Sequence, residues 1–136
     1  MIYLDSGVLI RAVLKHHPAY KACSILIHRD AVSSTHSLAE AFNTLTSHFQ
    51  VANSDAALAL ASLRDRMELE PITLEDYLRV LGDARRSGVQ GGLIYDALHA
   101  HVARRLKVQK IVTFNIRHFR HVAPDLQIEE PHGVAN

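Results

Sequence analysis

Several features of secreted and membrane proteins are missing from this sequence. Its 136 residues contain a single cysteine, Cys23, so no disulfide can form within the chain and nothing indicates an oxidising compartment. No apolar run has the length of a membrane span, and the N-terminus lacks the basic segment of a secretion signal. We therefore expect a cytoplasmic protein without membrane association.

The composition is that of a folded domain. Hydrophobic residues make up 48% and charged residues 21% of the chain, which separates it from disordered sequences. The length predicts one domain, residues 1–130, followed by a C-terminal tail, 131–136. The net charge of +1 identifies no partner, but six basic residues and no acidic one lie between Asp96 and Asp125. These are Arg104, Arg105, Lys107, Lys110, Arg117 and Arg120.

Short apolar segments that favour β-structure alternate with helix-favouring segments along the chain. The predicted strands cover residues 2–4, 31–34, 69–72, 110–113 and 126–128. The predicted helices include 37–50, 56–63, 73–88 and 93–106, together with a first helix that Ser6 would cap. This alternation predicts an α/β fold with a five-stranded, mostly parallel sheet flanked by helices on both faces, and Pro71 places its strand at the sheet edge.

Asp5 ends the first predicted strand and directly precedes the first helix. Ligands of open α/β sheets bind at such positions, outside the carboxyl ends of the strands. The alternative is that Asp5 only caps the helix. Whether Asp5 binds a ligand or only caps the helix therefore depends on which other polar residues reach the same edge of the sheet.

Glu40 lies one turn into the helix after the second strand, where its carboxylate would face the strand ends. Two alternatives compete with a functional role. The spacing from Ser37 to Glu40 is that of a capping box, and Asn43 on the same helix face is typical of a solvated surface.

Asp96 begins a helix that has little polar surface. Its neighbours three and four positions away are Gly92, Leu93, His99 and Ala100, so it does not lie on a charged outer face. A carboxylate among small apolar residues needs a partner, and a bound cation or the helix N-terminus can provide one.

Thr113 and Asn115 follow the fourth predicted strand. A hydroxyl and an amide at a strand end can position a phosphate or a metal-bound water, although both residues also suit a turn or a helix cap. Acids from three strand–helix units that meet at one sheet edge need neutralising charge, and hard oxygen ligands favour Mg²⁺ or Mn²⁺ over zinc. Such an ion lowers the pKa of a bound water, and the basic residues after Asp96 suit a polyanion, so metal-dependent phosphodiester hydrolysis uses all of these parts.

In order and spacing, these motifs resemble a PIN-domain ribonuclease, and more narrowly a VapC-type toxin of a bacterial or archaeal toxin–antitoxin pair. The motifs are Leu4-Asp5-Ser6, Glu40 after Ser37, Asp96-Ala97-Leu98-His99-Ala100, and the segment from Val112 to Phe119. The resemblance implies a five-stranded parallel sheet, Mg²⁺ or Mn²⁺ held by the acidic cluster, and endonucleolytic RNA cleavage. It also implies a homodimer inhibited by a small VapB-type antitoxin whose C-terminal segment wraps the toxin.

The sequence departs from this family pattern at two positions. Gly7 stands where the family often has Asn, and Asn115 stands where many members have a fourth acid. An amide supplies an oxygen without a charge, which argues against a second metal site, while the three matching acids keep a one-metal mechanism open.

We predict that Asp5 and Asp96 hold the ion and that Glu40 completes its shell or orients the attacking water. Thr113 and Asn115 would position the scissile phosphate or a metal-bound water. The predicted RNA-backbone contacts are Arg104, Arg105, Lys107, Arg117 and Arg120, although a solvated helix face also explains the first three.

Three other functions remain open. The same fold can bind RNA or a protein without cutting, and Asp5 can act as a phosphotransfer nucleophile, although Gly7 stands where that chemistry usually has a second acid. A zinc site could use His99, His101, His118 and His121, but His99 and His101 point to different helix faces, which favours surface or RNA-contacting roles.

The apolar residues Phe42, Leu45, Phe49 and Leu60 suit either the core or an antitoxin groove.

Overall fold

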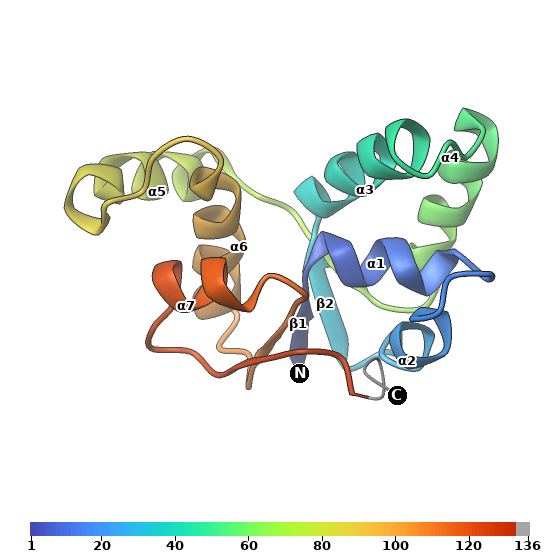
Figure 1. Ribbon diagram of the computed structural model, residues 1–136. Helices are drawn as coiled ribbons and strands as arrows, with labels where there is room; N and C mark the ends of the chain where they lie inside the picture. The colour runs from blue at the N-terminus through green and yellow to red at the C-terminus, as the bar shows by residue number, and fades with distance from the viewer. Residues whose placement is uncertain (133–136) are drawn as a thin grey trace.

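Five parallel strands form one sheet at the centre of the computed structural model, which describes residues 1–132 (Figure 1). The strands are β1 (Ile2–Leu4), β2 (Ala31–Ser34), β3 (Glu68–Glu70), β4 (Ile111–Val112) and β5 (Ile128–Glu129). Their order is β3-β2-β1-β4-β5, and every neighbouring pair is parallel. The predicted five-stranded sheet is therefore confirmed, with β3 at an edge as expected, although β3 ends at Glu70 and Pro71 lies just after it.

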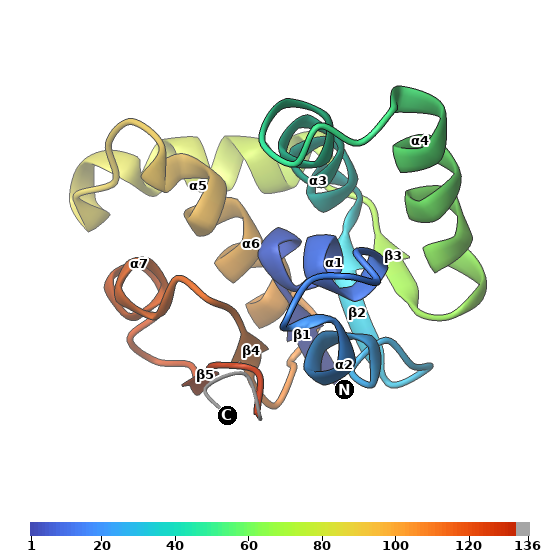
Figure 2. The same ribbon diagram turned by 45° about the vertical axis from the view of Figure 1, so that its right-hand side comes forward.

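Helices cover both faces of this sheet, as predicted. They are α1 (Ser6–Val13), α2 (Tyr20–Ser24), α3 (Thr35–Ser47), α4 (Asn53–Ala61), α5 (Leu74–Ser87), α6 (Leu93–Arg105) and α7 (Ile116–Val122), with a 3-10 turn at Ser62–Asp65. Figures 1 and 2 show α1 to α4 on one side of the strands, and α6 and α7 on the other. Of the helices within residues 1–132, none has both the length and the apolar character needed to span a bilayer.

The alternation of side chains along the short strands produces two cores. Tyr3 of β1 lies beside Val32 of β2 and Ile111 of β4, and these three pack with α6 and α7. Leu4 and Val112 point to the other face and pack with α1 to α4. Because successive strand residues face opposite sides, the three central strands β1, β2 and β4 contribute to both cores, whereas the edge strands β3 and β5 are less buried.

The predicted capping of α5 is confirmed. Thr73 accepts a hydrogen bond from the Asp76 amide, and Asp76 accepts one from the Thr73 amide, which completes a capping box. Gly88 ends the helix in the left-handed region, at φ 72°.

Some predicted boundaries differ from the structure. Asp5, and not Ser6, is the N-cap of α1, since its side chain accepts from the Ser6 amide. The helix α3 begins at Thr35, because the chain turns into it directly from β2 and leaves Ser37 buried inside the first turn. Of the predicted tail, Pro131 is buried, and residues 133–136 lie outside the described part of the chain.

Candidate active site

Polar side chains from neighbouring strands meet at the carboxyl edge of the sheet. Asp5 follows β1 and Thr113 follows β4, and these two strands are adjacent. The Thr113 hydroxyl donates a hydrogen bond of 2.8 Å to Oδ2 of Asp5, and both residues are buried. The strand ends thus bring together residues from opposite ends of the sequence.

The carboxylate of Asp5 has two protein donors. Its Oδ1 accepts from the Ser6 amide at 2.7 Å, while Oδ2 accepts from Thr113. The capping alternative is therefore part of what Asp5 does, but a carboxylate offers about four acceptor positions, so these two bonds leave capacity for a ligand. Thr113 also accepts from the Asn115 amide at 2.9 Å, which gives its hydroxyl a turn-forming role.

A histidine that sequence analysis assigned to a surface or RNA-contacting role lies at the centre of the site. His99 on α6 is fully buried, so that assignment was wrong. Its Nε2 lies 2.5 Å from Oε1 of Glu40 and 3.9 Å from Oδ1 of Asp5. Its Nδ1 lies 2.6 Å from the Tyr3 hydroxyl and 3.3 Å from that of Ser34. His99 therefore connects β1, β2, α3 and α6 beneath the acidic edge.

These neighbours determine the electrostatics of His99. Burial alone would lower the pKa of its imidazole, but the interaction with Tyr3, the hydrogen bond to Glu40 and the charge of Asp5 raise that pKa well above its ordinary value. His36 on α3 behaves in the opposite way, since burial lowers its pKa even though Glu40 lies 3.6 Å from its Nε2.

Glu40 belongs to this site and does not form a capping box. The N-cap of α3 is Ser34, and no side chain caps the helix there. The Glu40 carboxylate instead lies between His99 and His36, with 29% of its side chain exposed. The capping alternative for Glu40 was therefore wrong, because α3 begins two residues before Ser37.

Asp96, in the first turn of α6, has 14% of its side chain exposed. Burial and the negative charges of Asp5 and Glu40 raise its pKa to about 6, although His118 and His99 partly oppose this. The Nδ1 atom of His118 lies 3.3 Å from Oδ2 of Asp96. Asp5 and Glu40 thus lie close enough to Asp96 for their charges to raise its pKa.

The donor chemistry of this edge suits a hard divalent cation. Within residues 1–132, no three His, Cys, Asp or Glu side chains have the arrangement of a complete metal-ligand group. Mg²⁺, however, is usually held by one or two carboxylates and keeps several waters, which matches Asp5 and Asp96. Their mutual repulsion, visible in the raised pKa of Asp96, is what a cation would relieve. Glu40 is already bonded to His99.

Of the four histidines considered for zinc, three have different protein partners and the fourth, His121, lies exposed on α7. His99 contacts Glu40 and Tyr3, His101 contacts Asp76, and His118 contacts Asp96. Sequence reasoning missed Tyr3, Ser34, His99 and His118 as members of the acidic edge. The spacing from Asp96 to His99 was an available signal for His99, because residues three apart share a helix face.

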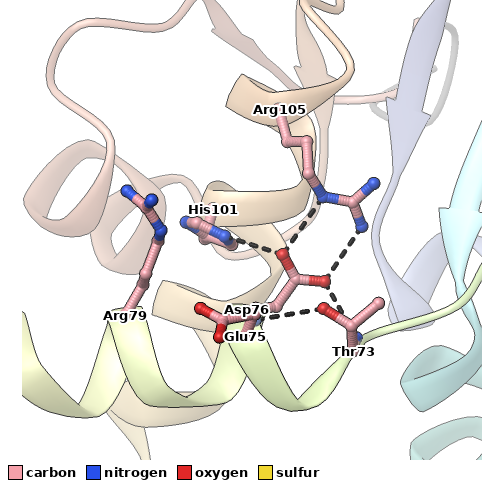
Figure 3. Close-up of a pocket in the computed structure, with 6 residues that line it drawn as sticks. All are labelled: Thr73, Glu75, Asp76, Arg79, His101 and Arg105. Atoms are coloured by element: carbon pink, nitrogen blue, oxygen red, sulfur yellow. Dashed lines mark hydrogen bonds and ion pairs between the residues drawn. The ribbon is translucent and has the colours of Figure 1, made fainter.

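Two of the residues predicted to contact RNA instead form ion pairs with acidic side chains of the protein itself. Arg105 donates two hydrogen bonds to Asp76 and one to Glu70, and Arg104 binds Asp125 through two nitrogen atoms. Figure 3 shows Arg105 and His101 of α6 converging on the Asp76 carboxylate. Burial would raise the pKa of Asp76, but its bonds with Thr73, His101 and Arg105 lower it to about 2. The exposed basic residues Lys107, Arg117 and Arg120 remain the stronger candidates for contact with a polyanion.

Of the four apolar residues that suited either the core or an antitoxin groove, two are buried in the core and two lie at the surface. Leu45 and Leu60 are buried in the core between α1 and α4. Phe42 is 38% exposed, and Phe49 lines a surface cavity together with Val13, Leu14 and Pro18.

Comparison with known proteins agrees with this architecture. A TM-score of 0.68 relates the chain to VapBC2 of Rickettsia felis, bound to a promoter DNA fragment, with 23% identity over 96% of this chain and 98% of that one. A toxin–antitoxin complex from Klebsiella pneumoniae has a TM-score of 0.67 and 14% identity over 97% and 98% of the two chains. VapC20 of Mycobacterium tuberculosis, a toxin that cleaves the sarcin–ricin loop, has a TM-score of 0.64 and 17% identity over 82% and 87%.

These likenesses to solved structures show the fold. A search of curated proteins finds no match. The family model of the PIN domain matches residues 2–124, nearly the whole chain and every residue of the acidic edge described above. The chain therefore belongs to the PIN domain family.

Proposed function

We propose that this protein is a Mg²⁺- or Mn²⁺-dependent endoribonuclease and the toxin of a VapBC-type toxin–antitoxin pair. The observation that carries the proposal is the edge formed by Asp5, Glu40 and Asp96, where burial and the two neighbouring carboxylates raise the pKa of Asp96 to about 6. Buried acids that repel one another are costly unless a cation neutralises them. Membership of the PIN domain family and the VapC-like fold support the same activity.

In this proposal each residue has a defined task. Asp5 and Asp96 hold the ion, which when bound stabilises charge on the phosphoryl oxygen and makes water nucleophilic at neutral pH. Thr113 fixes the Asp5 carboxylate through its hydroxyl. Glu40, held by His99, orients the attacking water, and the Asn115 amide helps to position the scissile phosphate.

The partners follow from the same comparison. The Rickettsia felis and Klebsiella pneumoniae structures contain toxin–antitoxin complexes, and we propose a VapB-type antitoxin for this chain.

We also propose a homodimer that forms through α5. Leu74, Leu78 and Leu81 are 72%, 53% and 57% exposed and share one face of that helix, so they form an apolar stripe that a second copy could cover.

RNA cleavage in Mn²⁺ or Mg²⁺, with and without EDTA, tests the activity. Wild type should cleave in the presence of the ion, whereas Asp5→Asn and Asp96→Asn should lose cleavage. Equal cleavage by all three proteins, or full cleavage in EDTA, would contradict the assignment.

Two observations favour a second function, that of a PIN-fold module which binds RNA or a protein without cutting. Glu40 is bonded to His99, and Asn115 brings no charge to the site. Calorimetric titration with Mn²⁺ separates the two functions, because a module that only binds need not take up the ion.

A further inference from the structure

A cavity of about 360 Å³ opens beside the acidic edge, and Glu40 is the one residue of its lining that has a task in the proposed hydrolysis. Its polar and aromatic lining consists of Ser6, His36, Glu40, Asn43, Thr44 and Tyr95. Two of these residues join it to the site, since Ser6 follows Asp5 and Glu40 is bonded to His99. A substrate whose phosphate lies at the acidic edge would therefore place an adjoining group here.

The cavity contains an aromatic platform built from two helices. The rings of His36 on α3 and Tyr95 on α6 are stacked, with centroids 5.3 Å apart and planes inclined by 14°. Although one face of Tyr95 meets His36, 48% of the residue is exposed. A large aromatic side chain held in place and still open to solvent is a surface on which a planar ligand can stack.

Polar groups surround this platform. Asn43 and Thr44 offer an amide and a hydroxyl from the same helix as His36. The Nε2 atom of His36 is buried and has no hydrogen-bond partner within the described residues, since Oε1 of Glu40 lies 3.6 Å away. An aromatic face bordered by an exposed amide and a hydroxyl matches the chemistry of a nucleobase, which has both a π-face and a polar edge.

We propose that this cavity is a nucleobase subsite, in which an unpaired base next to the scissile phosphate stacks on Tyr95 and is read at its edge by Asn43. The proposal rests on the proposed ribonuclease function, because the acidic edge places the phosphate. A single-stranded ligand is favoured over a duplex, since a base must leave its stack to enter the cavity.

Binding experiments test the subsite separately from cleavage. The probes are short single-stranded homopolymers rA, rC, rG and rU, and fluorescence anisotropy measures their affinity for the Asp96→Asn protein in EDTA. In this background Tyr95→Leu should weaken binding of the favoured homopolymers by roughly tenfold, the effect of losing one base–aromatic stack. Tyr95→Phe keeps the ring and should stay within about twofold of the parent.

A second variant tests the reading of the base edge. Asn43→Ala should change the ratio of affinities among the four homopolymers, whereas Tyr95→Leu should weaken several of them together. Leu58→Ala is the matched control, since Leu58 is 72% exposed on α4 and does not line the cavity. Thermal melting should show all variants folded, because Tyr95 and Asn43 are both exposed.

The outcomes separate this proposal from the proposed function. If the wild-type protein cleaves no RNA but RNA binding depends on Tyr95, the subsite is supported and the nuclease function is overturned. Cleavage that depends on Asp5 and Asp96 but is indifferent to Tyr95→Leu and Asn43→Ala would overturn the subsite. Unchanged RNA affinity in Tyr95→Leu would also overturn the subsite, and the aromatic platform would then be a candidate surface for a protein partner.

Discussion

The Thr113 hydroxyl lies 2.8 Å from Oδ2 of Asp5, across 108 positions of sequence. This bond crosses from β4 to β1 at the carboxyl edge of the sheet and orients the first acid of the site. Hydrogen bonds to ligating carboxylates determine how well those ligands are placed, so Thr113 is a positioning residue for the proposed ion.

Thr113→Val keeps the shape of the side chain and removes this donor. We expect Mn²⁺ affinity to fall roughly 10- to 100-fold, the usual cost of losing a partner of a metal ligand. Calorimetric titration measures the affinity, and Thr113→Ser is the control because it retains the hydroxyl. If the Val and Ser variants bind Mn²⁺ equally well, Thr113 does not position Asp5.

Asp96→Asn should stabilise the metal-free protein while abolishing cleavage. The pKa of Asp96 rises from 3.8 to about 6 on folding, so the folded state holds the proton more tightly, and stability falls as pH increases between those values. Removing the charge should therefore increase the free energy of unfolding at pH 8 by up to about 3 kcal/mol. Urea unfolding in EDTA at pH 8 and below pH 4 tests this. The gain should vanish at the lower pH, and a less stable variant at pH 8 would contradict the argument.

His99→Leu should destabilise the protein and release Glu40. The substitution leaves the Tyr3 hydroxyl and the Glu40 carboxylate without their shared partner, at a cost of about 2–4 kcal/mol. Tyr3→Phe removes only the hydroxyl and should cost about 1 kcal/mol. Urea unfolding compares the two variants, and an equal or larger effect of Tyr3→Phe would show that the bond to Glu40 contributes little.

Arg105→Met should act on stability and not on RNA binding. Arg105 helps to hold the pKa of Asp76 at about 2, so this carboxylate stabilises the fold above pH 4 and loses that contribution as pH falls towards 2. Without Arg105 we expect a loss of about 1–3 kcal/mol at pH 7. Lys107→Met, two positions along and exposed, is the control and should leave the unfolding free energy unchanged. If Arg105→Met instead weakens RNA binding without altering stability, the predicted RNA role of Arg105 is correct.

Leu78→Glu should convert the proposed dimer into a monomer. A charge at the middle of the exposed leucine face of α5 would have to be buried against a second copy, which is unfavourable without a partner. Sedimentation equilibrium measures the mass. Leu58→Glu changes an equally apolar, 72% exposed position on α4 and should not alter it. A monomeric wild type would remove the dimer from the proposal.

Local patterns were sufficient for the five strands, most helices and the α/β class, but α7 (Ile116–Val122) was not predicted. Alternating apolar segments predicted the five strands, Thr73 and Asp76 predicted the start of α5, and Gly88 its end, because these features depend on residues a few positions apart. Boundaries were less certain: the apparent capping box from Ser37 to Glu40 was overridden by the direct turn from β2 into α3.

The sequence by itself determined the α/β class, the strand-end position of Asp5 and the unusual apolar setting of Asp96, since each follows from spacing along one strand or helix. Only the tertiary structure decided that His99 is buried against Glu40, that Thr113 orients Asp5, and that Arg105 binds Asp76. The physical reason is that these contacts join segments 25 or more positions apart, and their partners are selected by strand order and helix packing, which no local pattern encodes.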